Sequence, residues 1–338
     1  MKPKNQIIYD WISFTTKIHS VNDILNILDF RPDTVRFQSN DYGRYFYTKS
    51  LYYDGIHLYY DGYSKEYGNM GVCVEMSGKG LRNWEEYSNA DYDKLFSLIL
   101  SHYDPVDPDN CGMKLTRLDV AYDDFDGILD LKQIMRDAQD YNYLSRLRNC
   151  TVNLDMSEGD ITGLTVAHGS MKSNVYIRMY DKRLEQKTKV LDHWIRVELQ
   201  LRKENANGFI MLHDTIEHKY FSVLNQYLRY LVHSEDSHRE RWSTAPYWLN
   251  FVRSAESASI FHKPKNDYKP ENLINYVENQ LSGAVSTYIE IVGVDNFLVN
   301  LHNARSGKSL NPKYKAIKDK ADSNGQQLLD YLKEHDLL

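Results

Sequence analysis

A tyrosine flanked by cations stands out in the segment from Ser173 to Arg183. The segment alternates as a strand does, which places Tyr180 between Arg178 and Lys182 on one exposed face, opposite an apolar face. A phenol with its ordinary pKa of about 10 is a poor nucleophile near neutral pH. Flanking positive charge would stabilise the phenolate and hold a phosphate. The pattern favours attack by Tyr180 on a DNA phosphodiester, with an ordinary surface tyrosine as the alternative, since the chain has 27 tyrosines.

Further charged side chains occupy the polar positions of other alternating segments. These are Glu75 in residues 71–76, Arg117, Asp119 and Asp123 in residues 114–124, and Arg196 and Glu198 in residues 194–202. If these strands are neighbours, carboxylates and guanidinium groups converge on one surface. Carboxylates suit Mg²⁺ or Mn²⁺, and arginine forks bind phosphate oxygens, so the set matches metal-assisted strand nicking. A solvated sheet face with cross-strand ion pairs is the alternative.

The elements that must position these residues alternate between strands and helices. Strands are predicted at residues 8–15, 71–76, 114–124, 175–182 and 194–202, with hairpins between 34 and 63. Helices are predicted at residues 21–28, 83–102, 131–147 and 216–233. The matching pairs Arg117–Asp119 and Arg196–Glu198 hint at two duplicated α+β halves, although chance similarity explains them equally well. The expected domains are a catalytic domain at 1–242 and a helical region at 243–338 for origin recognition or dimerisation.

Composition indicates a globular protein with a defined path for DNA. The net charge is −6, yet basic residues cluster at 171–203 and at 305–320. Three scattered cysteines are too few for a disulfide framework or a zinc site. No apolar run is long enough for a signal peptide or a membrane span, so a cytoplasmic protein without a membrane partner is expected.

Five segments in this order resemble the Rep_trans family of rolling-circle replication initiators and related relaxases of Gram-positive mobile elements. They are residues 10–15, 74–82, 116–123, 176–182 and 196–199. The resemblance implies an α+β fold, a curved antiparallel sheet of two TATA-binding-protein-like halves with helices on one side.

The same resemblance implies an enzyme that nicks one strand of origin DNA, forming a 5′-phosphotyrosine adduct and freeing a 3′ hydroxyl. Tyr180 would then be the nucleophile, and Asp119 and Glu198 the foremost metal ligands, followed by Asp123 and Glu75. The resemblance also implies a homodimer that works with a host helicase.

Other kinds of protein fit the sequence less well. None of the 12 histidines has the His-x-His spacing of the other large class of tyrosine nickases. A tyrosine recombinase would use His238 and Arg241, which lie in a polar connector. The P-loop-like Ser306–Ser309 lacks the first glycine, since His302 occupies that position. A non-enzymatic origin-binding protein on the same fold remains the alternative from another class.

Overall fold

The computed structural model describes residues 3–30, 35–65, 68–188, 190–253, 274, 277, 282–306 and 318. The chain divides into two compact units, residues 1–262 and residues 263–338. Each unit is described by itself below.

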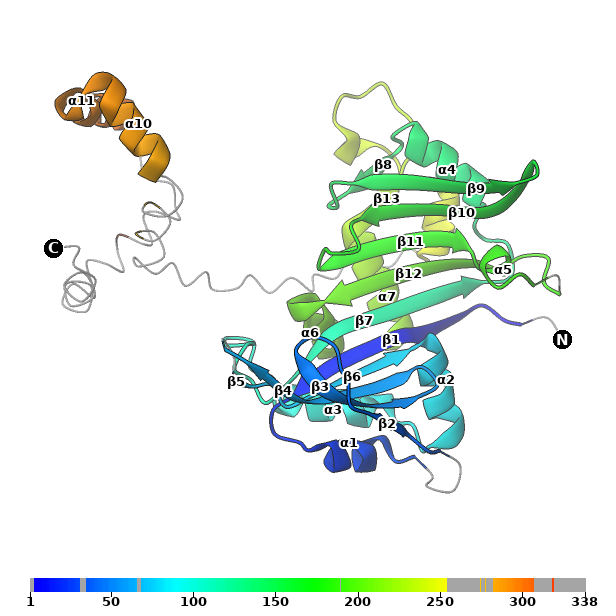
Figure 1. Cartoon of the computed structure of the whole chain (residues 1–338). Helices are drawn as coiled ribbons and strands as arrows, with labels where there is room; N and C mark the ends of the chain where they lie inside the picture. The colour runs from blue at the N-terminus through cyan, green and yellow to red at the C-terminus, as the bar shows by residue number, and fades with distance from the viewer. Residues whose placement is uncertain are drawn as a thin grey trace. The chain divides into compact units, whose positions relative to one another are not determined.

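The first unit is built on one large antiparallel sheet (Figure 1). Its strands follow the order β2-β3-β4-β6-β1-β7-β12-β11-β10-β9, and β5 pairs with β4. The bounds are β1 (Gln6–Thr16), β2 (Gln38–Asn40), β3 (Tyr47–Tyr53), β4 (Ile56–Ser64), β5 (Gly68–Asn69), β6 (Val72–Ser77), β7 (Met113–Asp124), β9 (Cys150–Ser157), β10 (Asp160–Gly169), β11 (Val175–Asp181) and β12 (Ile195–Arg202). The first six strands form one half of the sheet, and the pairing of β1 with β7 joins it to the other half.

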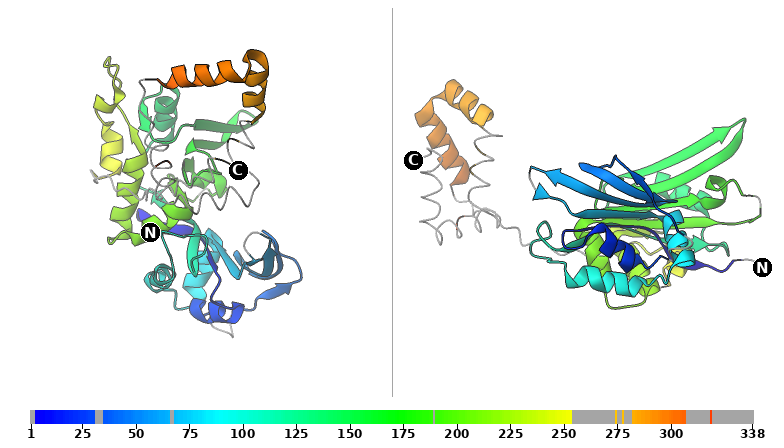
Figure 2. Two further views of the ribbon diagram at one scale, coloured as in Figure 1. Left: turned by 90° about the vertical axis from the view of Figure 1, so that its left-hand side faces the viewer. Right: turned by 60° about the horizontal axis from the view of Figure 1, so that its bottom comes forward.

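The larger helices gather on one side of this sheet, as the view from the end of the strands shows (Figure 2). They are α1 (Val21–Leu28), α2 (Gly78–Tyr87), α3 (Tyr92–Ser101), α4 (Leu131–Gln139), α6 (Lys203–Met211), α7 (Ile216–Tyr227) and α8 (Pro246–Phe251). The apolar positions of the strands pack into one core that includes Phe14, Leu118 and Leu199, all fully buried. Burial of this kind stabilises the fold by roughly 25 cal/mol per Å² of apolar surface. The expected α+β fold with helices on one side of a curved sheet is confirmed.

Two expected helices end early because the chain turns into a second, small sheet. The helix predicted at 131–147 ends at Gln139, and the one predicted at 216–233 ends at Tyr227. The residues that follow form β8 (Tyr143–Ser145) and β13 (Leu228–Tyr230), which pair with each other. The helical spacing of apolar residues continues through both segments, so it does not predict these two strands. Each strand forms because it pairs with the other, which is far away in the sequence.

The helix predicted at 83–102 is two helices, α2 and α3. Ser88 ends α2 and forms an isolated bridge with Phe30, and Asp91 caps α3 by accepting a hydrogen bond from the Lys94 amide. In addition, α2 begins at Gly78, five residues before the predicted start at residue 83, because Ser77 provides an N-cap.

The second unit contains α10 (Ser282–Val292) and α11 (Val294–Arg305), separated by Gly293 with a φ of 81°. The helical pattern expected before residue 301 is present in this described stretch. Most of the basic segment 305–320, by contrast, lies outside the described residues.

The expected boundary near Ser243 precedes α8, whose Trp248 and Phe251 are buried in the core of the first unit. Across the described residues, the structure has no helix long and apolar enough to span a membrane.

Candidate active site

Strand register brings the predicted chemical residues into rows across one face of the sheet. Tyr180 of β11 pairs with Arg196 of β12, and Arg196 pairs with Asp123 of β7. In the next row Arg178 pairs with Glu198. Because cross-strand partners point to the same face, β7, β11 and β12 present these side chains together, on the face opposite the apolar core.

This polar face is closed over by its own side chains. Tyr180 and Arg196 are each 5% exposed, Glu198 and Asp119 2%, and Asp123 is fully buried. The expected exposed face is therefore wrong for these residues, because ion pairs and aromatic rings cover them. The last predicted cation, Lys182, lies at the start of the short helix α5 (Lys182–Glu185) instead of on the strand.

The Tyr180 hydroxyl donates a hydrogen bond of 3.3 Å to Oε2 of Glu198, and Nζ of Lys182 lies 3.5 Å from the same hydroxyl. The Arg178 guanidinium lies 5.0 Å from the Tyr180 ring centroid. Burial raises the pKa of Tyr180 well above 10, and the Glu198 carboxylate raises it further. Arg196 and Arg178 oppose this shift but do not outweigh it. The neighbouring arginines thus stabilise the phenolate as expected, but burial outweighs them and the pKa of Tyr180 is raised overall.

Three arginines hold the carboxylates of this face. Arg178 Nη2 lies 2.8 and 2.7 Å from the two oxygens of Glu198, and Arg117 Nε lies 2.9 Å from Oδ1 of Asp119. Arg196 forms a two-bond fork with Asp123 at 2.7 and 2.8 Å. Such charge-assisted pairs are strong and fix the geometry of both partners.

A further carboxylate, Asp10 of β1, belongs to this group and was missed by sequence reasoning. Its Oδ1 accepts a hydrogen bond of 2.8 Å from Nη1 of Arg196. Burial raises the pKa of Asp119 to about 7, and the neighbouring Glu198 and Asp10 carboxylates contribute to the shift, although Arg117 opposes it. Asp10 begins the first segment of the family resemblance, which was the available signal, but only the pairing of β1 with β7 and β6 places it here.

The remaining two predicted metal ligands occupy different surroundings. Asp123 also accepts a hydrogen bond of 2.8 Å from the Trp194 indole, so both of its oxygens are engaged. Asp123 is therefore placed to orient the Arg196 side chain. Glu75 of β6 lies in a row with Ser13 and Arg117, and burial raises its pKa. It is thus brought to the same face, in a row that does not contain Tyr180.

Carboxylate oxygens are the ligands that Mg²⁺ and Mn²⁺ prefer. The negative charges of Glu198 and Asp10 repel that of Asp119 and raise its pKa, and a bound cation would reduce this repulsion. In this arrangement, however, arginines hold these carboxylates. Among the described residues, no group of three or more histidine, cysteine, aspartate or glutamate side chains is arranged to hold a metal ion. The donor chemistry of these carboxylates suits a divalent ion, whereas the arginine pairs described above occupy the oxygens that would hold it.

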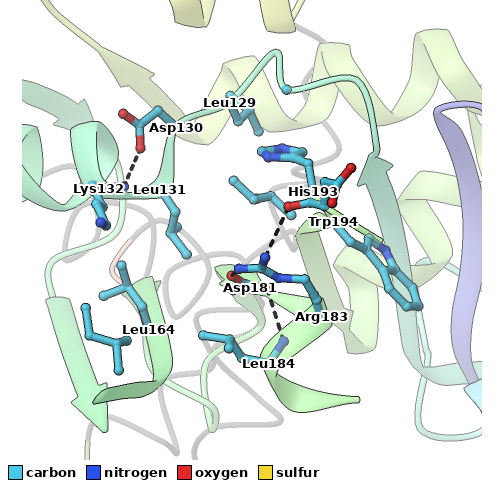
Figure 3. Close-up of a pocket in the computed structure, with 14 residues that line it drawn as sticks. Leu129, Asp130, Leu131, Lys132, Leu164, Asp181, Arg183, Leu184, His193 and Trp194 are labelled. Carbon is cyan, nitrogen blue, oxygen red and sulfur yellow. Dashed lines mark hydrogen bonds and ion pairs between the residues drawn. The ribbon is translucent and has the colours of Figure 1, made fainter. Parts of the chain in front are cut away.

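A cavity of about 550 Å³ lies beside the strand end that carries Tyr180 (Figure 3). The residues that line it include Asp181 of β11, Arg183 of α5, and His193 and Trp194 in the segment just before β12. Arg183 donates to Oδ2 of Asp181 at 3.0 Å and to the Asp192 carbonyl at 3.1 Å. These contacts fix the turn that follows the tyrosine.

Comparison with known proteins was made against this geometry. Residues 113–301 match the replication initiation factor family Rep_trans, and residues 6–101 match the N-terminal domain of rolling circle replication initiation proteins. The chain is 26% identical over 311 residues to NicK of Bacillus subtilis (strain 168), a protein named as a DNA relaxase, covering 86% of this chain and 84% of NicK.

The fold is also similar to a solved structure, the rolling circle replication initiator protein from Geobacillus stearothermophilus. The TM-score is 0.64 at 25% sequence identity, covering 76% of this chain and 99% of that one. Since the family match spans more than half of the sequence and includes β7, β11 and β12, this chain belongs to the Rep_trans replication initiation factor family.

Proposed function

We propose that this protein initiates rolling-circle replication by nicking one strand of origin DNA through Tyr180. The observation that carries the proposal is the Tyr180 hydroxyl, hydrogen-bonded to a buried carboxylate on a face that also holds Arg117, Arg178 and Arg196. The family to which the chain belongs and its similarity to a protein named as a relaxase support it.

In this reaction the Tyr180 oxygen forms a bond to phosphorus while the bond from phosphorus to the 3′ oxygen breaks. The phenol proton passes to Glu198, which already accepts it in a hydrogen bond. The leaving 3′ oxygen takes up a proton and becomes the free 3′ hydroxyl. The products are a 5′-phosphotyrosine and a primer end. Arg178 and Lys182, which flank the hydroxyl, would bind the oxygens of the attacked phosphate.

Dependence on Mg²⁺ or Mn²⁺ belongs to the same proposal. Asp119 and Oε1 of Glu198 would hold the ion with Asp10 beside them, which leaves Oε2 of Glu198 to accept the phenol proton. Asp123 is less suited because the Trp194 indole also binds it, and Glu75 because its row does not contain Tyr180. A bound divalent ion polarises a phosphoryl oxygen and offsets charge in the transition state. The reversible covalent linkage would also allow the nick to be closed again, as in a topoisomerase.

Replacement of Tyr180 by Phe tests the nucleophile, because it removes only the hydroxyl. We expect the variant to bind origin DNA like wild type and to form no covalent adduct on denaturing gels. Tyr176→Phe is the matched control, since Tyr176 lies four residues earlier on the same face of β11. An undiminished adduct in Tyr180→Phe would contradict the assignment. Wild-type protein that binds the origin but never nicks it would favour the non-enzymatic alternative.

Separate substitutions of Asp119 and Glu198 test the metal. Asp119→Asn and Glu198→Gln should each weaken Mn²⁺ binding, measured by calorimetry, and lower the nicking rate by at least about tenfold. Asp181→Asn serves as control, because Asp181 caps α5 away from the paired carboxylates. Full nicking by wild type in excess EDTA would exclude an essential divalent ion.

The proposal also includes three partners: the origin duplex, a second copy of the chain in a homodimer, and a host helicase. Light scattering with and without origin DNA would measure the dimer. An unwinding assay would measure the partnership with the helicase, because helicase loading in it depends on a nicked origin.

A further inference from the structure

We propose that an aromatic platform in the first half of the sheet stacks the unpaired bases that flank the nick, so that the strand held at Tyr180 continues across this half. The aromatic platform consists of Tyr45, Phe46, Tyr52, His57 and Tyr59. The proposal rests on the proposed nicking function, which supplies the single strand.

The platform is a run of rings on β3, β4 and the loop between β2 and β3. His57 and Tyr59 stack with centroids 5.4 Å apart and an interplanar angle of 7°, and Tyr52 lies 4.6 Å from His57. Tyr45 meets Tyr59 edge-on at 6.0 Å. Tyr45 is 56% exposed and Phe46 is 81% exposed, so the outer rings face solvent.

The backbone holds these outer rings at some cost. Tyr45 and Phe46 have φ angles of 55° and 69°, consecutive left-handed conformations that side chains of this size rarely adopt. A hydrogen bond from the Ser50 hydroxyl to the Tyr42 carbonyl ties the loop to β3. Two exposed aromatic rings on such a backbone bury little apolar surface in the protein itself, which favours a role in binding.

Strand register places Tyr52 and His57 on the same face as the residues proposed for catalysis, and Tyr45 shares a side-chain hydrogen bond with Glu75 on that face. Tyr52 pairs with His57, His57 with Glu75, Glu75 with Ser13, and Ser13 with Arg117. Five strand steps separate β4 from β11, or about 24 Å along the sheet at about 4.8 Å per step. That length corresponds to roughly seven stacked nucleotides at about 3.4 Å each.

Cations lie in the platform's own loop and on the strands between it and Tyr180. Arg44 precedes Tyr45 in the loop, whereas β7 with Arg117 and β12 with Arg202 lie between β4 and β11. The guanidinium groups of Arg44, Arg117 and Arg202 act on the Glu75 carboxyl, so all three lie near it. Within the described part of the chain, Arg202 makes no ion pair, and its buried Nε has no hydrogen-bond partner. A backbone phosphate would satisfy this group.

Single-stranded DNA fits these features better than duplex DNA. Rings can stack on bases only where the bases are unpaired, and an electropositive groove with aromatic rings is the usual design of single-strand sites. Since stacking needs no specific base edge, the platform would bind many sequences alike.

Binding without divalent ion tests the platform independently of nicking. Full-length wild type, Tyr45→Ala and Phe46→Ala are titrated with oligonucleotides that carry the cleavage site alone, or the site extended on its 5′ or 3′ side. A 2-aminopurine base in the extension reports stacking by loss of fluorescence. We expect each substitution to weaken binding of one extended oligonucleotide roughly five- to hundredfold, to restore the fluorescence, and to leave binding of the short oligonucleotide unchanged.

Tyr141→Ala is the matched control. Tyr141 is 54% exposed with a φ of 59°, much like Tyr45, but lies between α4 and β8. It should bind every oligonucleotide as wild type does. Unchanged affinity of both platform variants for the extended oligonucleotides would overturn the proposal. So would equal losses on the short oligonucleotide or on duplex DNA. Absence of nicking by wild type would instead overturn the proposed function and leave these binding results interpretable.

Discussion

Tyr180 and Asp119 lie in the same closed polar face, and burial raises the pKa of each. In the proposed reaction, the neutral phenol of Tyr180 would be a poor nucleophile until its proton passes to the Glu198 carboxylate. When a phosphate binds, Arg178 and Arg196 have a competing anion to pair with. Release of Glu198 from Arg178 would then strengthen it as a proton acceptor for Tyr180.

The buried His168 of β10 makes the stability of the fold depend on pH. It is fully buried, its Nε2 shares a hydrogen bond of 2.9 Å with the Tyr230 hydroxyl, and burial lowers its pKa to about 4. In the unfolded chain the pKa returns to about 6.5. Between these values the unfolded state binds more protons than the folded state, so stability is lost as pH falls from about 6.5 to 4.

We therefore expect wild type to lose about 2–3 kcal/mol of unfolding free energy from this residue between pH 7.5 and pH 4.5. His168→Gln should lack that part of the loss, although its stability at pH 7.5 is lower. Urea unfolding of both proteins at the two pH values measures the difference. Identical pH dependence would show that His168 is not held neutral.

At the level of elements, the start of α2 is fixed by close backbone contact with the turn between β3 and β4. Gly55 has a φ of 95°, and its carbonyl accepts hydrogen bonds from the Ser77 amide at 2.9 Å and the Ser77 hydroxyl at 3.1 Å. A Cβ on Gly55 would lie 2.6 Å from Ser77 Oγ and 2.7 Å from the Gly80 nitrogen. This contact holds β6, which carries Glu75, against β4.

Gly55→Ala should therefore destabilise the protein more than Gly159→Ala. Both glycines have a φ near 90°, so each substitution costs about 1 kcal/mol in backbone strain. Only at Gly55 would the added Cβ also crowd neighbouring atoms, because no described atom lies within 4 Å of a Cβ on Gly159. We expect an additional loss of about 1–3 kcal/mol for Gly55→Ala from crowding. Equal midpoints in urea unfolding would contradict the close contact.

At the level of the whole molecule, the residues proposed for the chemistry lie in the first unit, while the family match continues into the second. The predicted division of labour assigns origin recognition to the region after Ser243, with the basic segment 305–320 contacting phosphates. That segment lies largely outside the described residues, so the assignment stays a prediction.

The double substitution Lys315→Ala and Lys318→Ala tests this assignment. Each lysine that contacts a phosphate releases counterions on binding, so the slope of log K against log salt should decrease by about two. Duplex origin binding should weaken, while nicking of a short single strand with the cleavage site should persist. An unchanged salt slope would leave the segment without a role in duplex binding.

The sequence by itself determined the strands β7, β11 and β12 and the identity of the nucleophile candidate, because strict alternation and charged spacing are local properties. Period two also predicted which residues share a face within each strand. That Glu198, Asp119 and the arginines share one face depended on these strands being neighbours, which the pairing of β7, β12 and β11 decides. The ends of α4 and α7 could not be predicted, because β8 and β13 depend on a partner distant in sequence.

Only the tertiary structure decided how closed that face is and which carboxylates meet there. Burial depends on what neighbouring strands place over a residue, so Tyr180 is buried although its own segment indicates exposure. Asp10 reaches Arg196 only because β1 pairs between β6 and β7. The pKa shifts of Tyr180 and Asp119 follow from the same burial, which no local pattern in the sequence contains.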